Sequence, residues 1–482
     1  MSLHKICFAY CQLPTAYFIR ASVSFLIVVC CVASTSVDKK LKIESWVTFG
    51  NGSKLLEHSS LHFDGQKSAS VIVIDTVTKY QTIDGFGYCL TGGSAQLINQ
   101  KLKAKDKSAL LHELFSTEGN GIGISYLRIS IGASDLDDHV FSYDDIAKGE
   151  TDENLTHFDL GIDRVNLIPV LKEIIKINPT IKIMASPWSA PTWMKTNGKV
   201  KGGALKKEFY QAYANYFVKY IQEMKKEGIA IDAVTLQNEP EHPGNTPSMT
   251  MTSEEQKEFV KNFLGKTFEA NAIKTKIIVY DHNCDHPNYP ISILDDAAAK
   301  KFIDGSAFHL YLGDIGALSK VHDAHPDKNV YFTEQWTSGK GEFAGDLRWH
   351  VKNLVVGAPR NWSRNVLEWN LAADENFDPH TNDGGCNLCK GAITVDSKTS
   401  AVSKNVSYYI IAHASKFVPQ GSVRISSNVV NNLYNVAYIT PTGKKVLIVV
   451  NDNDVEKTFS LNYKNQTSTT ALPSGAVATY VW

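Results

Sequence analysis

Two glutamates lie near the ends of apolar segments that have the pattern of buried strands. Glu239 belongs to TLQNEP, residues 235–240, and Glu334 belongs to VYFTEQW, residues 330–336. In a barrel of parallel strands, the carboxyl ends of all strands meet at one rim, so both side chains are expected there. Two carboxyl groups cleave a glycosidic bond when one protonates the leaving oxygen and the other attacks the sugar carbon, and a separation of about 5 Å gives retention of configuration. We therefore predict Glu239 and Glu334 as the two catalytic carboxyl groups.

Four tryptophans fall at or just after the ends of predicted strands. A sugar ring has apolar faces that stack on large aromatic side chains, and such side chains also offer a polar edge. A tryptophan at such a place can belong to the core, but four at one rim favour a role in sugar binding. They are Trp188, Trp193, Trp336 and Trp369.

Three further side chains are placed near the glutamates by the strand pattern. His309 and Tyr311 alternate along one predicted strand and therefore face the same side, which predicts a binding role for His309. Arg128 lies inside the apolar segment SYLRISI. Because a buried arginine needs a carboxylate partner, we expect Arg128 to pair with Glu334.

Eight segments between residues 81 and 403 have the composition of strands, and helical patterns separate them. This alternation predicts an α/β fold with parallel strands. A doubly wound sheet is an alternative, but a count of eight favours a closed (β/α)8 barrel, the TIM barrel. The predicted strands are residues 83–90, 124–132, 181–188, 231–240, 276–283, 306–312, 329–336 and 364–371.

Short alternating segments flank this region on both sides. They are separated by turns that contain glycine, proline and asparagine, which is typical of strands in antiparallel sheets. We predict one side β-sandwich assembled from residues 38–80 and 404–482, next to a catalytic barrel of residues 81–403.

The first 36 residues differ from the rest of the chain. An apolar run, Ala21 to Ala33, follows Arg20, and no acidic residue precedes Asp38. This is the pattern of a secretory signal peptide, and it is short for a membrane span. An alternative is a lipoprotein leader with Cys30 or Cys31 as the lipidated residue, which would supply a lipid anchor. We expect a secreted, periplasmic or cell-surface protein without an integral membrane span.

The composition is that of an ordinary globular protein. Of 482 residues, 43% are hydrophobic and 21% are charged, and the formal net charge is −1. Without a basic field, nucleic acid is not an expected partner. Cys386 and Cys389 form a CxxC motif in a predicted loop. Because no second pair of cysteine or histidine residues lies nearby, a local disulfide is favoured over a zinc site.

The motifs around these residues resemble those of family 30 of the glycoside hydrolases, which contains the lysosomal glucosylceramidases and bacterial relatives. The resemblance implies a (β/α)8 barrel with a side sandwich and the hydrolysis of β-glycosides. The matching segments run in order and are QTIDGFG (81–87), YLRISIGASD (126–135), ASPWSAPTWMKTNG (185–198), QNEP (237–240), HLY (309–311), FTEQW (332–336), EWNL (368–371) and SKFVPQGSVRI (415–425).

The resemblance also implies roles for individual residues. It assigns the acid/base to Glu239 and the nucleophile to Glu334, and it places Asn238 at the 2-hydroxyl of the sugar. No metal ion or organic cofactor belongs to this chemistry. The other residues implied are Arg128 and Tyr311 around the nucleophile, and Trp188, Trp369 and Asn370 in the sugar subsite.

One position departs from the family pattern. Where the glucosylceramidase motif has an aspartate that contacts the far hydroxyls of a terminal glucose, the segment YCLTGGSA has Gly92. Glycine cannot make that contact, so exo action on a terminal glucose is in question unless Asp84 or Asp374 replaces the missing carboxylate. The change could instead open the subsite toward a chain, as in the β-1,6-glucanases of the family.

The leading hypothesis is an enzyme, a retaining β-glycosidase of glucosylceramidase type, which would place it in sphingolipid or carbohydrate metabolism. The first alternative is an endo-β-1,6-glucanase or another retaining β-glycosidase of the same family. An alternative from another class is a carbohydrate-binding protein without catalysis, against which the presence of both glutamates argues. Turnover of an aryl β-glucoside separates an enzyme from a binding protein.

Overall fold

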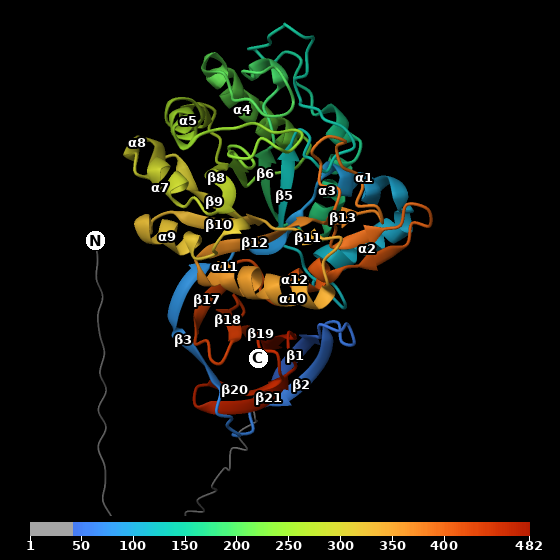
Figure 1. Ribbon diagram of the computed structural model, residues 1–482, viewed down its shortest axis with the longest axis vertical. Coiled ribbons are helices and arrows are strands. Elements are labelled where there is room, and N and C mark those ends of the chain that lie inside the picture. Colours follow the sequence, from blue (N-terminus) through green and yellow to red (C-terminus); the bar gives the residue numbers. More distant parts are fainter. Residues whose placement is uncertain (1–41) are drawn as a thin grey trace, which may run out of the picture. The chain divides into compact units, whose positions relative to one another are not determined.

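The computed structural model describes residues 42–482, and Figure 1 shows the course of the chain. The predicted leader, residues 1–36, lies outside the described residues, and so does the choice between a signal peptide and a lipid anchor. Within residues 42–482, no helix is both long enough and apolar enough to cross a membrane.

Eight parallel strands close into a barrel. Helices cover a parallel barrel on the outside, so its strands are buried on both faces, and all six residues of β5 are buried. The predicted α/β fold and the closed barrel are confirmed. In barrel order the strands are β10 (Asn329–Glu334), β12 (Ser363–Asn370), β4 (Gly85–Cys89), β5 (Tyr126–Ile131), β6 (Lys182–Pro187), β7 (Ala233–Thr235), β8 (Lys276–Cys284) and β9 (Ile303–Gly313).

The helices between the strands bury one face against the barrel. In α4 (Tyr210–Lys226), aromatic residues recur at three- and four-residue spacing, and Tyr213, Tyr216 and Tyr220 are fully buried. Helix α5 (Ser253–Phe259) begins with a capping box between Thr252 and Glu255, which satisfies free backbone N–H groups. The other helices are α1 (Gly92–Gln96), α2 (Ala104–Phe115), α3 (Leu167–Ile177), α6 (Gly265–Ala270), α7 (Asn288–Leu294), α8 (Ala297–Lys300), α9 (Ala317–Ala324), α10 (Phe343–His350), α11 (Ala358–Arg360) and α12 (Val406–Ser415).

A nine-stranded sheet takes its strands from both ends of the described chain. Strand β3 lies between two C-terminal strands, antiparallel to β17 and parallel to β20. The predicted side domain built from both chain ends is confirmed, although β21, with the polar sequence QTSTTAL, was not among the predicted strands. In sheet order the strands are β2 (Glu57–His62), β1 (Lys42–Thr48), β22 (Val477–Val481), β19 (Lys445–Asn451), β18 (Leu433–Ile439), β17 (Val423–Ser427), β3 (Val71–Thr82), β20 (Lys457–Tyr463) and β21 (Gln466–Leu472).

Helix α12 connects the sheet to the barrel. All ten of its residues are buried, and it packs on β4 of the barrel and on β22 of the sheet. His413 of α12 lies between two threonines of the sheet: Nδ1 is 2.9 Å from Oγ1 of Thr479 and Nε2 is 2.9 Å from Oγ1 of Thr48. The predicted boundary at residue 404 therefore precedes a helix that contacts both parts.

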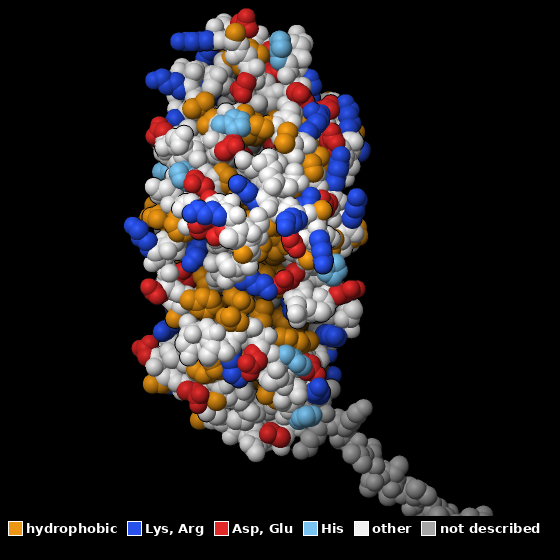
Figure 2. All heavy atoms as spheres, turned by 90° about the vertical axis from the view of Figure 1, so that its right-hand side faces the viewer, with side chains coloured by type: hydrophobic (Ala, Val, Ile, Leu, Met, Phe, Trp, Pro, Cys, Tyr) orange, Lys and Arg blue, Asp and Glu red, His pale blue; other side chains and the backbone are white. Residues whose placement is uncertain are grey.

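Small strands brace the loops on the catalytic side of the barrel. They are β11 (Thr337–Ser338) paired with β14 (Cys389–Lys390), and β13 (Ala372–Ala373) in one sheet with β15 (Ile393–Val395) and β16 (Val402–Lys404). On the face drawn in Figure 2, acidic and basic side chains are interspersed over the surface. Neither charge forms a large continuous area on that face.

Candidate active site

The ends of strands β7 and β10 position the two predicted catalytic glutamates. Glu334 is the last residue of β10. Glu239 lies beyond the end of β7, which is shorter than the predicted strand, and its φ of 48° is in the left-handed region. That conformation costs a residue other than glycine about 1–2 kcal/mol. The backbone N–H of Glu239 donates to the carbonyl of Asp281 on β8, at 3.0 Å, and helps to hold this turn.

The two carboxylates meet at one imidazole. Nδ1 of His309 lies 3.4 Å from Oε1 of Glu239 and 3.6 Å from Oε1 of Glu334. The two oxygens can therefore be no farther apart than the sum of these distances, which is within the range of glycosidase carboxyl pairs. Both glutamates line one cavity of about 360 Å³. The predicted meeting of these side chains at one rim is confirmed.

Arg128 holds Glu334 from below the cavity. Its guanidinium is fully buried, and Nη1 donates to Oε2 of Glu334 at 2.6 Å, which confirms the predicted pairing. Nη2 donates to Oδ1 of Asn238 at 2.6 Å and to Oδ2 of Asp281 at 2.8 Å. Glu334 also accepts a hydrogen bond from the hydroxyl of Tyr311, at 2.9 Å. Both donors favour the ionised carboxylate.

Asp281 is a second buried carboxylate behind the pair. It accepts hydrogen bonds from the hydroxyls of Thr235 and Thr333, both at 2.7 Å, and lies 3.3 Å from Nε2 of His309. Burial opposes its ionisation, but Arg128 and the hydrogen bonds outweigh burial and hold the pKa of Asp281 well below its usual range. Asp281 is therefore a fixed negative charge that orients Arg128 and His309.

Glu239, Glu334 and His309 are close enough to titrate as one unit. Burial disfavours the charged imidazole of His309, but the surrounding carboxylates, Glu334 first, outweigh burial and raise its pKa to about 9. Burial raises the pKa of Glu239, and the contact with His309 lowers it by more. Burial raises the pKa of Glu334, against the opposing effects of His309 and Arg128. The proton shared by Glu239 and His309 therefore lies on the imidazole.

Aromatic rings and a disulfide form one wall of the cavity. Trp336 and Trp369 line it, together with Cys386 and Cys389. Trp369 stacks on Trp188 with 5.3 Å between the ring centres. Cys386 and Cys389 are joined in a disulfide, so the expected local disulfide is confirmed.

The predicted site residues fall into three groups. Those on the cavity surface are Glu239, Glu334, Tyr311, Trp336 and Trp369. Those buried directly beneath it are Arg128, Asn238, Trp188 and His309. Asn370 is buried as well, but its amide oxygen accepts a hydrogen bond from Ser94 at 2.7 Å, and it is not on the cavity surface.

Three acidic or basic residues on the cavity surface were not among the predicted site residues, namely Asp135, His242 and His282. Asp135 ends the motif YLRISIGASD, and burial together with Glu334 and Glu239 raises its pKa to about 8. His282 follows Asp281 on β8, and the change from apolar to polar residues at that point of the sequence was the available signal. A carboxyl group that stays protonated near neutrality can donate as well as accept, which suits sugar hydroxyls.

Neither of the two aspartates considered as replacements at Gly92 lies at the cavity. Asp84 pairs with Arg364 at 2.7 Å, and Asp374 accepts from the backbone of its own loop. Instead, the space beside Gly92 is filled by another carboxylate: a Cβ on Gly92 would lie 1.7 Å from Oδ1 of Asp137. The absence of a side chain at residue 92 therefore makes room for Asp137.

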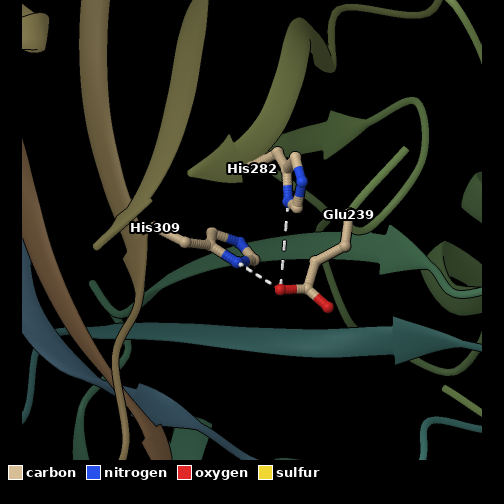
Figure 3. A group of neighbouring side chains, drawn as sticks. All are labelled: Glu239, His282 and His309. Carbon is tan, nitrogen blue, oxygen red and sulfur yellow. Dashed lines mark hydrogen bonds and ion pairs between the residues drawn. The ribbon is translucent and has the colours of Figure 1, made fainter. Parts of the chain in front are cut away.

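Three side chains on adjacent strands could together hold a metal ion. The ligand atoms of Glu239, His282 and His309 all lie within 4.8 Å of one another, and Figure 3 shows the two imidazoles pointing at one carboxylate oxygen.

The barrel and the paired carboxylates define a glycoside hydrolase, and comparison with known proteins gives its family. The model of the glycosyl hydrolase family 30 TIM-barrel domain matches residues 83–418, and that of the family 30 beta sandwich domain matches residues 421–480. The chain belongs to glycosyl hydrolase family 30, as the sequence motifs predicted. It is a glycosidase.

Individual relatives cover nearly the whole chain. An endo-1,6-β-D-glucanase of Trichoderma harzianum is 32% identical over 86% of this chain and 87% of its own length. The lysosomal acid glucosylceramidase of Mus musculus is 29% identical over 86% of this chain and 83% of its own length. Among solved structures, an endo-β1,6-glucanase superposes with a TM-score of 0.86 at 34% identity and covers 92% of this chain and 99% of its own.

Proposed function

We propose that the protein hydrolyses β-glucosidic bonds with retention of configuration, with Glu239 as general acid/base and Glu334 as nucleophile. The observation that carries this proposal is the approach of both buried carboxylates to Nδ1 of His309 at the surface of one cavity. Retention requires two carboxyl groups about 5 Å apart, one on each side of the sugar.

In the first step, a carboxylate oxygen of Glu334 attacks the anomeric carbon while Glu239 protonates the departing oxygen. A covalent glucosyl ester forms and the aglycone leaves as an alcohol. Arg128 and Tyr311 hold the attacking carboxylate by hydrogen bonds. Because His309 carries the shared proton before substrate binds, transfer from its Nδ1 to Glu239 supplies the acid form.

In the second step, Glu239 acts as a base. It takes a proton from water, the water oxygen attacks the anomeric carbon, and Glu334 departs as a carboxylate. The reaction releases the sugar with a β-configured anomeric hydroxyl and returns the proton to the Glu239 and His309 pair. Substrate hydroxyls are positioned by Asp135 and Asn238, and the sugar face stacks on Trp336 or Trp369 at the cavity wall.

We propose β-1,6-glucan as the first substrate and glucosylceramide as the second. Three endo-1,6-β-glucanases are 31–34% identical to this chain, and Gly92 removes a contact that a terminal glucose would use. The similarity to the mouse glucosylceramidase, at 29% identity, supports glucosylceramide as the second candidate substrate. A panel of β-1,6-glucan, laminarin, glucosylceramide and xylan, with analysis of product lengths, tests the choice: oligosaccharides from β-1,6-glucan support it, and release from the lipid alone overturns it.

Azide distinguishes the two catalytic roles. The variant Glu334→Gly should lose hydrolysis of an aryl β-glucoside and, with azide in the vacated space, form α-glucosyl azide. The variant Glu239→Ala should form β-glucosyl azide, because azide then attacks the glucosyl ester. Glu241→Ala is the matched control, since Glu241 is bonded to His286 away from the cavity. If neither variant yields an azide product of the expected configuration, the proposed roles are wrong.

We also propose that the protein is secreted. The apolar run behind Arg20 has the pattern of a signal peptide. The Cys386–Cys389 disulfide supports an oxidising compartment, because disulfides persist there and are rare in the cytosol. Amino-terminal sequencing of the mature protein tests this proposal: a start close to residue 37 supports it, and an intact residue 1 contradicts it.

A further inference from the structure

Three adjacent strands of the barrel carry one potential metal ligand each. Glu239 follows β7, His282 lies on β8 and His309 lies on β9. Nδ1 of His282 is 3.9 Å and Nδ1 of His309 is 3.4 Å from the same carboxylate oxygen of Glu239. In a tetrahedral zinc site with bonds of about 2.0–2.1 Å, neighbouring ligand atoms are about 3.4 Å apart. The distance from His309 already has this value, and all three ligand atoms lie within 4.8 Å of one another. A movement of the His282 ring must therefore shorten its distances to the other two ligand atoms.

His282 has a donor atom with no other use. Its side chain is 9% exposed, and among residues 42–482 its buried Nδ1 finds no hydrogen-bond partner. A buried polar atom without a partner costs about 1–3 kcal/mol. A metal ion on Nδ1 would satisfy it, and Figure 3 shows this nitrogen aimed at the oxygen of Glu239.

His309 has the support that metal-binding histidines have. Its other nitrogen, Nε2, lies 3.3 Å from Oδ1 of Asp281, which is itself fixed by Arg128. A carboxylate behind a ligating histidine orients the ring and strengthens its binding. The cavity lies on the open side of the three ligands, since Glu239 and His282 are on its surface. Two histidines, one glutamate and one open position are the ligand set of known zinc sites.

We propose that Glu239, His282 and His309 bind a zinc-class divalent cation, and that this cation reversibly inhibits the enzyme. The ion displaces the proton from Nδ1 of His309 into solvent, because a ligating imidazole nitrogen must be deprotonated. The inhibition rests on the proposed function, because a metal ion on Glu239 takes the carboxylate that must carry the acid proton. The cation and the substrate compete for the same cavity. The site is a regulatory one, and it supplies no step of the hydrolysis.

Calorimetric titration of Zn²⁺ into the full chain, without substrate, tests the binding site. One equivalent should bind the wild type, and the variant His282→Ala should bind at least about tenfold more weakly. The matched control is His242→Ala, since His242 is on the same cavity surface but outside the ligand group. It should change zinc affinity by less than twofold. Equal affinity in the wild type and in His282→Ala overturns the site, as does the absence of binding to the wild type.

Two further measurements keep the test decisive. If His282→Ala does not fold, anomalous scattering from a zinc-soaked crystal of the wild type locates the ion: a peak between the three ligands supports the site, and a peak elsewhere overturns it. Zinc should raise KM for an aryl β-glucoside with kcat unchanged, and EDTA should reverse the effect. Inhibition that lowers only kcat overturns competition. The two proposals can fail separately. If zinc binds at these three ligands but the azide test fails, the metal site stands and the proposed function is wrong.

Discussion

The close fit between Gly92 and Asp137 determines how the change Gly92→Ala affects the free energy of unfolding. The effect should reverse its sign when the Asp137 carboxylate is removed. Asp137 is buried, and its Oδ2 accepts hydrogen bonds from the backbone N–H and the hydroxyl of Ser134, at 2.7 and 2.9 Å. In Gly92→Ala, the new Cβ would lie 1.7 Å from the other carboxylate oxygen. Because this contact is impossible, the Asp137 side chain must turn away, and both hydrogen bonds to Ser134 are lost.

The size of the effect follows from two opposing contributions. Loss of two buried hydrogen bonds costs about 2–4 kcal/mol. The cost lies between the values for neutral and for charged acceptors, because burial raises the pKa of Asp137 to about 7 and leaves its carboxyl group partly neutral. Alanine in place of glycine in a helix gains about 1 kcal/mol, and Gly92 begins α1. The loss is larger, so Gly92→Ala should destabilise the protein by about 1–3 kcal/mol.

Denaturant titrations of five proteins measure this effect: the wild type, Gly92→Ala, Asp137→Ala, the double variant and Gly345→Ala. In an Asp137→Ala background the same Gly92→Ala change should be neutral or stabilise by up to about 1 kcal/mol, because the obstructing carboxylate is gone. Gly345→Ala in α10 is the matched control, since a Cβ there meets no atom within 4 Å, and it should stabilise by about 0.5–1 kcal/mol. If Gly92→Ala is as well tolerated as Gly345→Ala, or if Asp137→Ala does not relieve its effect, the reasoning is refuted.

Three other perturbations test separate parts of the structure. Glu239→Ala should slow aryl glucosides with poor leaving groups by about 10²–10⁴-fold and those with good leaving groups far less; equal losses in kcat would contradict the acid role. Burial lowers the pKa of His413 to about 3, so below pH 6.5 the unfolded chain takes up a proton that the folded chain does not, and stability falls by about 1.4 kcal/mol per pH unit. His413→Gln should remove this slope in urea titrations at pH 7 and pH 4.5, and an unchanged slope would disprove the assignment. Replacing Cys386 and Cys389 by serine should cost at most about 2 kcal/mol, because the closed loop is short, and should raise KM more than it lowers kcat; unchanged KM would show that the disulfide does not shape the cavity.

Much of the barrel could be predicted from the sequence, because parallel strands that are buried on both faces have nearly continuous apolar sequences. Each of the eight predicted segments overlaps a barrel strand, and the glutamates near two of their ends meet as expected. Strand β7 shows the limit of this pattern. The apolar run indicated a strand to residue 240, whereas pairing stops at Thr235 and the chain turns so that Glu239 enters the cavity.

The residues around the acid/base were harder to predict, because local backbone geometry places them. Tyr280 and Asp281 both have positive φ, of 73° and 69°, and the pairing of β8 with β9 shifts register between Tyr280 and His282. Such an irregularity breaks the alternation of side chains on the two faces of a strand. A regular strand would have sent one of Asp281 and His282 away from the site, whereas here Asp281 contacts His309 and His282 contacts Glu239.

The balance of charge explains how two carboxylates can lie so close in a buried site. Arg128 and a protonated His309 supply two positive charges, and Glu239, Glu334 and Asp281 supply three negative charges. The surplus of one negative charge, fixed in place before substrate arrives, stabilises the positive charge that develops on the sugar carbon in the transition state. Moving the proton from His309 to Glu239 leaves this total unchanged, so the acid can form inside the site without an ion entering from solvent. If Arg128 or His309 were replaced by a neutral residue, the site would carry one more net negative charge. The site would then take up a proton, most readily on Glu334 or Glu239. Either uptake would disturb catalysis, because Glu334 must stay ionised and Glu239 must release its proton to the leaving group.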